Sequence, residues 1–358
     1  MSNGGGVIDF TDIIKNIAPE VAEIVERRYL ILRTILYNQP IGRRALATEL
    51  GIGERIVRNE VNILKDHGLL NIEIMGMNVT DVGKNLLDEL NHIYKDFKGI
   101  LELQRELQSL MGLKQVIIIP GNSSENDTVL REMGKIASNI IKSKIHPKDI
   151  IGITGGSTMA CVAEEMTVSQ ISNDVLVIPA RGGLGGEIET QANAIAAKIG
   201  KRLGGAYRLL NVPDTLEAEA LNIIVKNDEI RSSINLINRI NLLVFGIGRA
   251  DTMASRRNLP QERIDTILKL GAKAEAFGHY FDIEGNEIWE YKTIGLSLER
   301  FREIENVIAV AGGSDKAEAI MAITSLRKDI IIVTDESAAI KILDLVKINN
   351  EVKNSPAS

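Results

Sequence analysis

The sequence predicts an α/β protein in which a small helix-turn-helix domain precedes a larger domain built on a doubly wound, Rossmann-like parallel sheet. Two patterns support this fold class. From residue 114 onward, short apolar runs alternate with helical segments, which is typical of a parallel sheet with crossover helices. Before that point, two helical segments are joined by the short turn Gly51-Ile52-Gly53, as in a helix-turn-helix.

The composition restricts the class of protein further. A length of 358 residues allows two or three domains, and the single cysteine, Cys161, excludes a disulfide framework or a cysteine-rich zinc site. The four histidines lie far apart in the sequence, so we predict no metal site. No apolar run approaches the length of a membrane span, and residues 1–6 are polar and glycine-rich, unlike a signal peptide. We therefore expect a cytoplasmic protein with no membrane partner.

Charge is distributed unevenly along the chain. Residues 27–70 contain eight arginine and lysine residues against four acidic residues, a balance of +4, whereas the whole chain has a net charge of −6. The remainder therefore carries −10. A basic segment on an acidic body predicts a polyanion as the partner of the front domain alone.

The front domain is expected over residues 1–85. Its last part, Leu70–Val79, alternates roughly in polarity and contains Gly76, as the β-hairpin of a winged helix-turn-helix does. Apolar residues at helical spacing and the breaks between them predict the helices Asp9–Glu26, Arg28–Tyr37, Arg43–Leu50 and about Glu54–His67.

The last of these helices has two different faces. Val57, Val61 and Leu64 share one stripe and should pack inward, whereas the opposite face carries side chains that can reach base edges or phosphates in a major groove. The alternative is a small helical bundle whose charged face is only solvated; the turn, the hairpin and the basic charge favour double-stranded DNA. With two arginines of the preceding helix, the predicted DNA-binding residues are Arg43, Arg44, Arg55, Arg58, Asn59, Asn62 and Lys65.

Residues 86–112 are expected to form a linker helix between the two domains. An apolar stripe runs from Leu86 to Leu110 at helical spacing. Such a stripe either packs against its own domain or pairs with the same helix of a second copy, and the sequence alone leaves both alternatives open.

The larger domain is expected over residues 113–350. Its predicted helices include Asp127–Ser143, Gln191–Leu203 and Gln261–Leu270. Between them lie the apolar runs that predict strands, which are Val116–Ile119, Asp149–Ile153, Asp174–Ile178, Asn241–Phe245, Val307–Ala311 and Ile330–Thr334.

The strand over Asp149–Ile153 ends in the turn Thr154-Gly155-Gly156-Ser157-Thr158. Its glycines let the backbone approach a ligand, its hydroxyl residues can cap the following helix, and the free N–H groups of that helix suit a phosphate. The alternative is a turn that binds nothing. The spacing matches neither the three-glycine dinucleotide fingerprint nor the lysine-bearing P-loop, so we predict no NAD or ATP and no other cofactor.

Three more predicted strands end in glycine-rich turns, at Ala180–Gly186, Gly246–Ala250 and Gly312–Lys316. Because a parallel sheet binds its ligands at the carboxyl ends of its strands, these turns should converge on one site. Helix starts at Ser157 and Ser314 can each hold an anion. A ligand with two phosphates is therefore predicted.

Four motifs, Gly152–Thr158, Gly246–Gly248, Gly271–Asp282 and Gly312–Lys316, resemble the sugar-binding domain of the SorC family of bacterial regulators. The resemblance implies a winged-helix DNA-binding domain and an effector domain of the sugar-phosphate isomerase and deaminase type. The front end is similar to a member that represses glycolytic genes, which implies fructose 1,6-bisphosphate as the effector that relieves repression.

The motifs and the resemblance together give the expected effector-binding residues. One of them departs from the family pattern, because many SorC relatives have an aspartate where this chain has Glu275, and the longer side chain changes the fit to sugar hydroxyls. The expected set is Thr154, Gly155, Gly156, Ser157, Thr158, Arg181, Gln191, Arg256, Glu275, Gly312, Gly313 and Lys316.

Two functions of different classes fit these patterns. A sugar-phosphate enzyme with an accessory DNA-binding domain would need a general acid and a general base, for which Glu275, His279 and Asp282 are the candidates. A repressor needs only binding residues. We expect the repressor and no enzyme, with operator DNA, a sugar phosphate and further copies of the chain, in a dimer or a tetramer, as partners.

Overall fold

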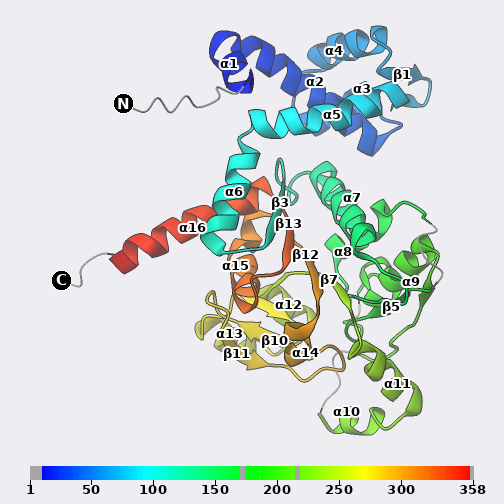
Figure 1. The fold of residues 1–358 in the computed structure, drawn as a ribbon, viewed down its shortest axis with the longest axis vertical. Helices are drawn as coiled ribbons and strands as arrows, with labels where there is room; N and C mark the ends of the chain where they lie inside the picture. Colours follow the sequence, from blue (N-terminus) through cyan, green and yellow to red (C-terminus); the bar gives the residue numbers. More distant parts are fainter. Residues whose placement is uncertain (1–9, 170–173, 185, 214–217, 355–358) are drawn as a thin grey trace. The chain divides into compact units, whose positions relative to one another are not determined.

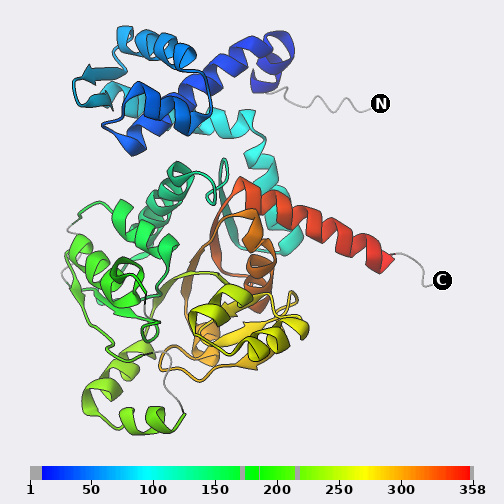
Figure 2. The same cartoon turned by 180° about the vertical axis from the view of Figure 1, so that it is seen from behind.

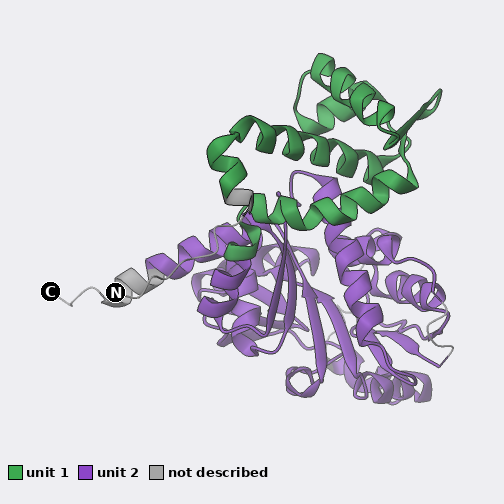
Figure 3. Ribbon diagram, turned by 45° about the horizontal axis from the view of Figure 1, so that its top comes forward, with its two compact units in different colours: residues 1–103 green, residues 104–358 purple. Residues whose placement is uncertain are grey.

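The computed structural model describes residues 10–169, 174–184, 186–213 and 218–354 (Figure 1). The chain divides into two compact units, residues 1–103 and residues 104–358 (Figure 3). Across the described ranges, no helix combines the length and the apolar character that crossing a lipid bilayer requires.

The first unit begins with α1 (Phe10–Ile17) and α2 (Pro19–Asn38). The predicted boundary between the first two helices, near residue 27, is wrong, because the break lies at Ala18. Proline lacks an N–H group and its ring disfavours a helical conformation at the preceding residue, and Ala18 has φ −148° and ψ 64°. The predicted second helix is the carboxyl-terminal half of α2.

The two helices of the predicted helix-turn-helix are α3 (Arg43–Leu50) and α4 (Glu54–Asp66), so both predictions are confirmed. Gly51 ends α3 in the left-handed conformation, at φ 63°, where glycine carries no steric cost. The chain then forms the antiparallel hairpin of β1 (Leu70–Glu73) and β2 (Gly76–Val79). A further bridge between Ile41 and Met77 joins this hairpin to the segment before α3.

The predicted single helix between the domains is wrong, because two helices, α5 (Asp81–Phe97) and α6 (Ile100–Met111), occupy this part of the chain. They are separated at Gly99, whose φ of 67° is left-handed. The burial of the apolar stripe is mixed. Ile100 and Leu107 are buried within one chain, whereas Ile93 and Leu110 are exposed. Pairing of this stripe with a second copy therefore stays a prediction.

The second unit contains a seven-stranded parallel sheet with the order β3-β13-β12-β7-β4-β5-β6. The six predicted strands are confirmed, with small shifts at their ends. The edge strand β6 was not predicted, because its two residues are too short a run to recognise. The strands are β3 (Gln115–Ile119), β4 (Ile150–Ile153), β5 (Leu176–Pro179), β6 (Ala206–Tyr207), β7 (Leu242–Gly246), β12 (Asn306–Val310) and β13 (Ile331–Asp335).

Helices cover both faces of this sheet, as the doubly wound class requires. On one face α7 (Asp127–Lys144), α8 (Ser157–Glu165) and α9 (Ala192–Leu203) bury an apolar core against the strands (Figure 1). Figures 1 and 2 show α15 (Ala317–Leu326) and α16 (Glu336–Asn354) on the opposite side. The remaining helices of the sheet domain are α10 (Ala218–Ile224), α11 (Asp228–Ile237) and α14 (Leu298–Glu303), with a short 3-10 turn over Ile188–Thr190.

A second, antiparallel sheet is inserted between β7 and β12, and the sequence did not reveal it. Its strands are short and separated by glycines, so no alternation of polarity stands out. The insertion also contains α12 (Ala250–Arg256) and α13 (Gln261–Lys269) (yellow in Figure 2). The strand order is β11-β10-β9-β8, with β8 (Gly248–Arg249), β9 (Ala274–Ala276), β10 (His279–Phe281) and β11 (Glu287–Glu290).

The order of the large sheet fixes the position of a crevice. The chain continues from β4 to β5 on one side and from β7 to β12 on the other, while β4 and β7 themselves are neighbours. At such a reversal the connections leave the sheet in opposite directions and open a space above the strand ends.

Candidate functional site

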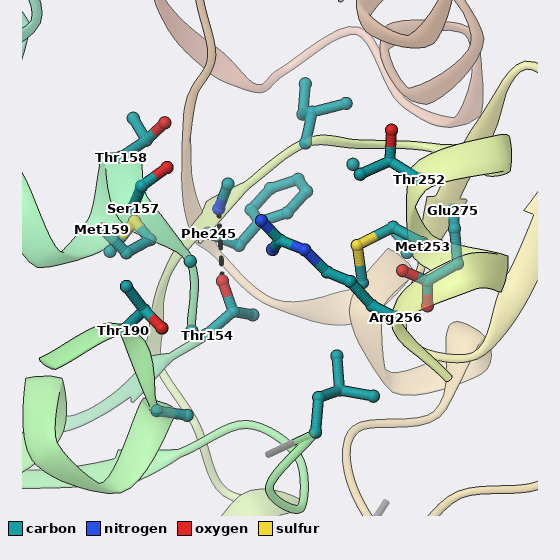
Figure 4. Close-up of a pocket in the computed structure, with 18 of the residues that line it drawn as sticks. Thr154, Ser157, Thr158, Met159, Thr190, Phe245, Thr252, Met253, Arg256 and Glu275 are labelled. Carbon is teal, nitrogen blue, oxygen red and sulfur yellow. Dashed lines mark hydrogen bonds between the residues drawn. The ribbon is translucent and has the colours of Figure 1, made fainter. Parts of the chain in front are cut away.

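A cavity of about 570 Å³ lies at the carboxyl ends of β4, β5, β7 and β12 and against the inserted sheet. The structure brings most of the predicted effector-binding residues together in its wall. Figure 4 shows Thr154, Ser157 and Thr158 on one side and Arg256 and Glu275 on the other. The predicted residues that line the cavity are Thr154, Gly155, Gly156, Ser157, Thr158, Arg181, Gln191, Arg256, Glu275 and Lys316.

The first wall of the cavity is the start of α8. Gly156 precedes the helix at φ 115° and no side chain caps it, so the prediction that Ser157 and Thr158 act as caps is wrong; they form the first turn itself. Gly155 lies so close to the next segment that a Cβ atom would stand 2.7 Å from the carbonyl oxygen of Thr190. The first N–H groups of a helix have no partner within it, so this turn is suited to an anion.

Thr154 connects the two strands at the crevice. Its Oγ1 atom accepts a hydrogen bond of 3.2 Å from the backbone N–H of Gly246 (dashed in Figure 4). The end of β4 is thereby tied to the end of β7, and the Thr154 side chain is held in the cavity wall.

The opposite wall contains a buried charge cluster around Glu275. Its Oε1 atom accepts hydrogen bonds from Arg181 Nη1 at 3.1 Å, from Arg257 Nη2 at 2.9 Å and from the backbone N–H of Gly278 at 2.7 Å. Burial alone would raise the pKa of Glu275, but the guanidinium groups of Arg181 and Arg257 outweigh it and hold this pKa below its usual value. Glu275 is therefore an ionised carboxylate, which does not suit a general acid.

Two other cations, Arg256 and Lys316, also line the cavity. Among the residues that the structure describes, neither of these side chains has a hydrogen-bond or ion-pair partner. Burial lowers the pKa of Lys316, and the neighbouring carboxylate of Asp315 opposes this shift only in part. These two side chains are the positive charges most available to a bound anion.

The glycine turn after β12 does not line the cavity, unlike the other three. The predicted residues Gly312 and Gly313 instead enclose the buried carboxylate of Asp335, the last residue of β13. Asp335 Oδ2 accepts hydrogen bonds of 2.7 Å from the backbone N–H groups of Gly313 and Ser123. The anion that binds at this turn is therefore the carboxylate of Asp335 and not an external phosphate. Of the segment Gly312–Lys316, only Asp315 and Lys316 line the cavity.

Sequence reasoning missed several residues at the site. Arg257 carried no signal, because a buried arginine looks like any other arginine in a sequence. Asp335 follows a predicted strand directly, so the rule that singled out the other strand ends applies to it as well. Arg249 also lines the cavity and is held by Asp251 and by Asp315, the latter at 3.1 Å.

The predicted DNA-binding face lies on α3 and α4 of the first unit. Val57, Val61 and Leu64 are buried, as predicted. Glu54 pairs with Arg58 at 3.3 Å and with Arg44 at 3.6 Å. Arg43 is half-buried, whereas the remaining predicted residues, Arg44, Arg55, Arg58, Asn59, Asn62 and Lys65, are exposed.

Comparisons with known proteins agree with the presence of both domains. The family model of the CggR N-terminal DNA-binding domain matches residues 24–94, and the Sugar-bind family of sugar-binding domains matches residues 95–344. The "Central glycolytic genes regulator" of Bacillus subtilis is 40% identical over 92% of this chain and 97% of its own length. The structure of a SorC family transcriptional regulator from Enterococcus faecalis is 35% identical, with a TM-score of 0.63, over 68% of this chain and 99% of that chain.

The chain belongs to the SorC family of transcriptional regulators. The full-length sorbitol operon regulator SorC from Klebsiella pneumoniae has the same fold, with a TM-score of 0.66 over 88% of this chain and 98% of that chain, at 20% identity. Like these SorC-family proteins, the chain has an N-terminal DNA-binding domain followed by a sugar-binding domain. The relatives are regulators rather than enzymes, so the enzymatic alternative is set aside.

Proposed function

We propose that the protein represses central glycolytic genes and leaves its operator when fructose 1,6-bisphosphate binds the cavity. In this proposal residues 1–85 form a winged helix-turn-helix that contacts DNA, residues 86–112 connect the domains, and residues 113–350 bind the effector. The observation that carries the proposal is the cavity itself, which offers an anion two separate places to bind. The relatives named for central glycolytic genes support the choice of target.

The DNA-binding half of the proposal rests on the exposed face of α4. Arg55, Arg58, Asn59 and Asn62 present donors and acceptors in the way that recognition helices do in a major groove. Lys65, in the last turn, suits a phosphate. The hairpin of β1 and β2 follows α4 directly and supplies the wing.

The effector half assigns one phosphate to each wall. The first phosphate binds at the start of α8, where Ser157 and Thr158 add hydroxyl donors to the backbone N–H groups. The second binds Arg256 and Lys316, which have no carboxylate of their own among the described residues. This assignment replaces the predicted second site at the Gly312–Gly313 turn, because Asp335 already occupies that turn.

The sugar between the phosphates would contact polar groups on both sides of the cavity. Gln191 and the carboxylate of Glu275 line the cavity and are suited to hydroxyl groups. Because Glu275 is held by Arg181 and Arg257, its position is fixed before the ligand arrives.

Release from DNA then follows from linkage. The effector must bind more tightly to the conformation that binds DNA poorly, and the operator must weaken effector binding by the same factor. Operators with repeated half-sites are read by symmetric assemblies, so the functional unit in this proposal is a dimer or a tetramer.

The decisive experiment titrates the operator complex with fructose 1,6-bisphosphate, fructose 6-phosphate and glucose 6-phosphate and follows DNA binding by fluorescence anisotropy. We expect release by the bisphosphate at concentrations at least about a hundredfold lower than by either monophosphate, because the second phosphate adds contacts with both Arg256 and Lys316, each of which contributes roughly 1.5–3 kcal/mol. Equal potency of the bisphosphate and fructose 6-phosphate would contradict the two-phosphate site. A protein that binds no operator upstream of glycolytic genes would contradict the target.

A further inference from the structure

We infer that Arg257, whose side chain is fully buried, is a positioning residue that fixes two cations of the cavity wall for a phosphorylated effector. The inference rests on the proposed function and extends it to a residue that does not line the cavity. Its basis is a chain of contacts that connects the end of α12, the inserted sheet and the segment after β5.

Arg257 follows α12 directly and is enclosed on all sides. Its Nη1 atom lies 3.2 Å from the hydroxyl oxygen of Tyr280, and its guanidinium carbon lies 5.9 Å and 5.4 Å from the ring centres of Tyr280 and Tyr291. Its Nη2 atom donates to Glu275 Oε1 at 2.9 Å. A planar guanidinium can make these contacts at the same time, whereas a lysine ammonium cannot.

These contacts determine where the cations of the cavity lie. Arg256 is the last residue of α12 and projects into the cavity (Figure 4). The next residue, Arg257, is anchored in the interior. Glu275 Oε1, held by Arg257, also accepts from Arg181, which lines the cavity. One buried side chain therefore supports Arg256 through the backbone and Arg181 through a carboxylate.

The cluster combines charges of both signs. The carboxylate of Glu275 lies between the guanidinium groups of Arg181 and Arg257. Burial raises the pKa of the Tyr280 hydroxyl to about 12, so this hydroxyl adds no charge near neutral pH. Arg257 therefore orients Arg181 by holding the carboxylate that both arginines contact.

The test measures binding of fructose 1,6-bisphosphate and fructose 6-phosphate by titration calorimetry in the full chain. The variants are Arg257→Met, Arg257→Lys and the control Arg263→Met, which removes an exposed arginine from the same insertion. Arg257→Met should weaken bisphosphate binding about ten- to hundredfold, by analogy with the loss that follows when a residue that orients a metal-binding side chain is replaced. The ratio of bisphosphate to monophosphate affinity should also fall, because Arg256 is displaced.

Arg257→Lys should recover part of the affinity, and Arg263→Met should bind both ligands as the wild type does. Thermal melting without ligand reports folding. If Arg257→Met does not fold, the ratio of bisphosphate to monophosphate affinity in Arg257→Lys provides the test. Lysine retains the positive charge but not the planar geometry of the guanidinium group. An unchanged affinity ratio in the folded variants would overturn the inference. A wild type that binds neither sugar phosphate would instead overturn the proposed function on which the inference rests.

Discussion

At the scale of single residues, the cavity contains cations in two different states. Arg181 and Arg249 already have carboxylate partners, so a phosphate that binds them must compete with these carboxylates. Arg256 and Lys316 have no such partner among the residues described, so a phosphate there does not compete with a carboxylate for their side chains. Effector affinity should therefore depend more steeply on the second pair.

Replacing Lys316 with alanine tests this dependence. A hydrogen bond to a charged group contributes roughly 1.5–3 kcal/mol, so the concentration of fructose 1,6-bisphosphate needed for release should rise about ten- to hundredfold. Operator affinity without ligand should not change. An operator titration of wild type, Lys316→Ala and the exposed-lysine control Lys226→Ala measures both quantities, and identical release curves would exclude Lys316 from the phosphate site.

The protonation of Lys316 predicts how effector binding depends on pH. Burial lowers the pKa of Lys316 in the free protein, whereas a bound phosphate raises it again because an opposite charge favours the ammonium form. Binding is therefore coupled to proton uptake, and affinity should fall as the pH rises through the lowered pKa of the free protein. Titration calorimetry from about pH 7 to about pH 10 covers this window. In Lys316→Met this decrease of affinity with rising pH should disappear. A decrease of the same size in the variant would mean that another group causes it.

At the scale of secondary structure elements, α4 should contact both the bases and the phosphates of the operator. Arg58 pairs with Glu54 only at the surface, which holds it weakly and leaves it free to turn toward a base. Arg58→Ala should weaken operator binding by about 1–3 kcal/mol and leave binding to unrelated DNA nearly unchanged. Lys65→Ala should weaken both equally and reduce the salt slope by about one. Anisotropy at matched salt on both DNAs distinguishes these effects, and an Arg58→Ala protein with wild-type operator affinity would remove α4 from base recognition.

The turn after β12 predicts a stability effect rather than a binding effect. Asp335 also accepts hydrogen bonds from Ala338 N at 2.8 Å and from the Ser123 hydroxyl at 2.5 Å, so one carboxylate joins three separate segments. Asp335→Ala leaves buried N–H groups without an acceptor, at about 1–3 kcal/mol each. Urea unfolding of the effector-binding unit should show a loss of roughly 3 kcal/mol or more, against almost none for the exposed Asp344→Ala. A loss below about 1 kcal/mol would mean that water replaces the carboxylate.

The elements also show which features a sequence reveals. Six strands of the large sheet were predictable because each is a continuous, mostly buried apolar run, whereas the short, exposed β6 was not. The helices α3 and α4 were predictable because glycines mark their ends. The inserted sheet was not, because strands as short as β8 and β9 are stabilised by their neighbours rather than by their own pattern. For the same reason the sequence placed Glu275 at the site but not Arg257, which is linked to it only in three dimensions.

At the scale of the whole molecule, repression of an operator with repeated half-sites requires more than one copy of the chain. The apolar stripe that first suggested a dimer is only partly buried within one chain, because Ile93 and Leu110 remain exposed. We still expect at least two chains per operator, because a single helix-turn-helix reads only one half-site. Light scattering of the operator complex measures this number directly, and one chain per full operator would contradict the expectation.

The proposed positions of the two phosphates have a consequence for selectivity. The α8 wall is tied to the neighbouring backbone through Gly156 N and Thr190 O at 2.8 Å, and α12, which bears Arg256, ends at the buried anchor Arg257. If the two phosphates bind these walls, the backbone fixes the distance between the two phosphate positions. The cavity then selects ligands by the distance between their phosphate groups. Bisphosphates of equal charge but shorter or longer carbon chains would then be rejected by length, so the protein would report one metabolite rather than the total phosphate charge around it.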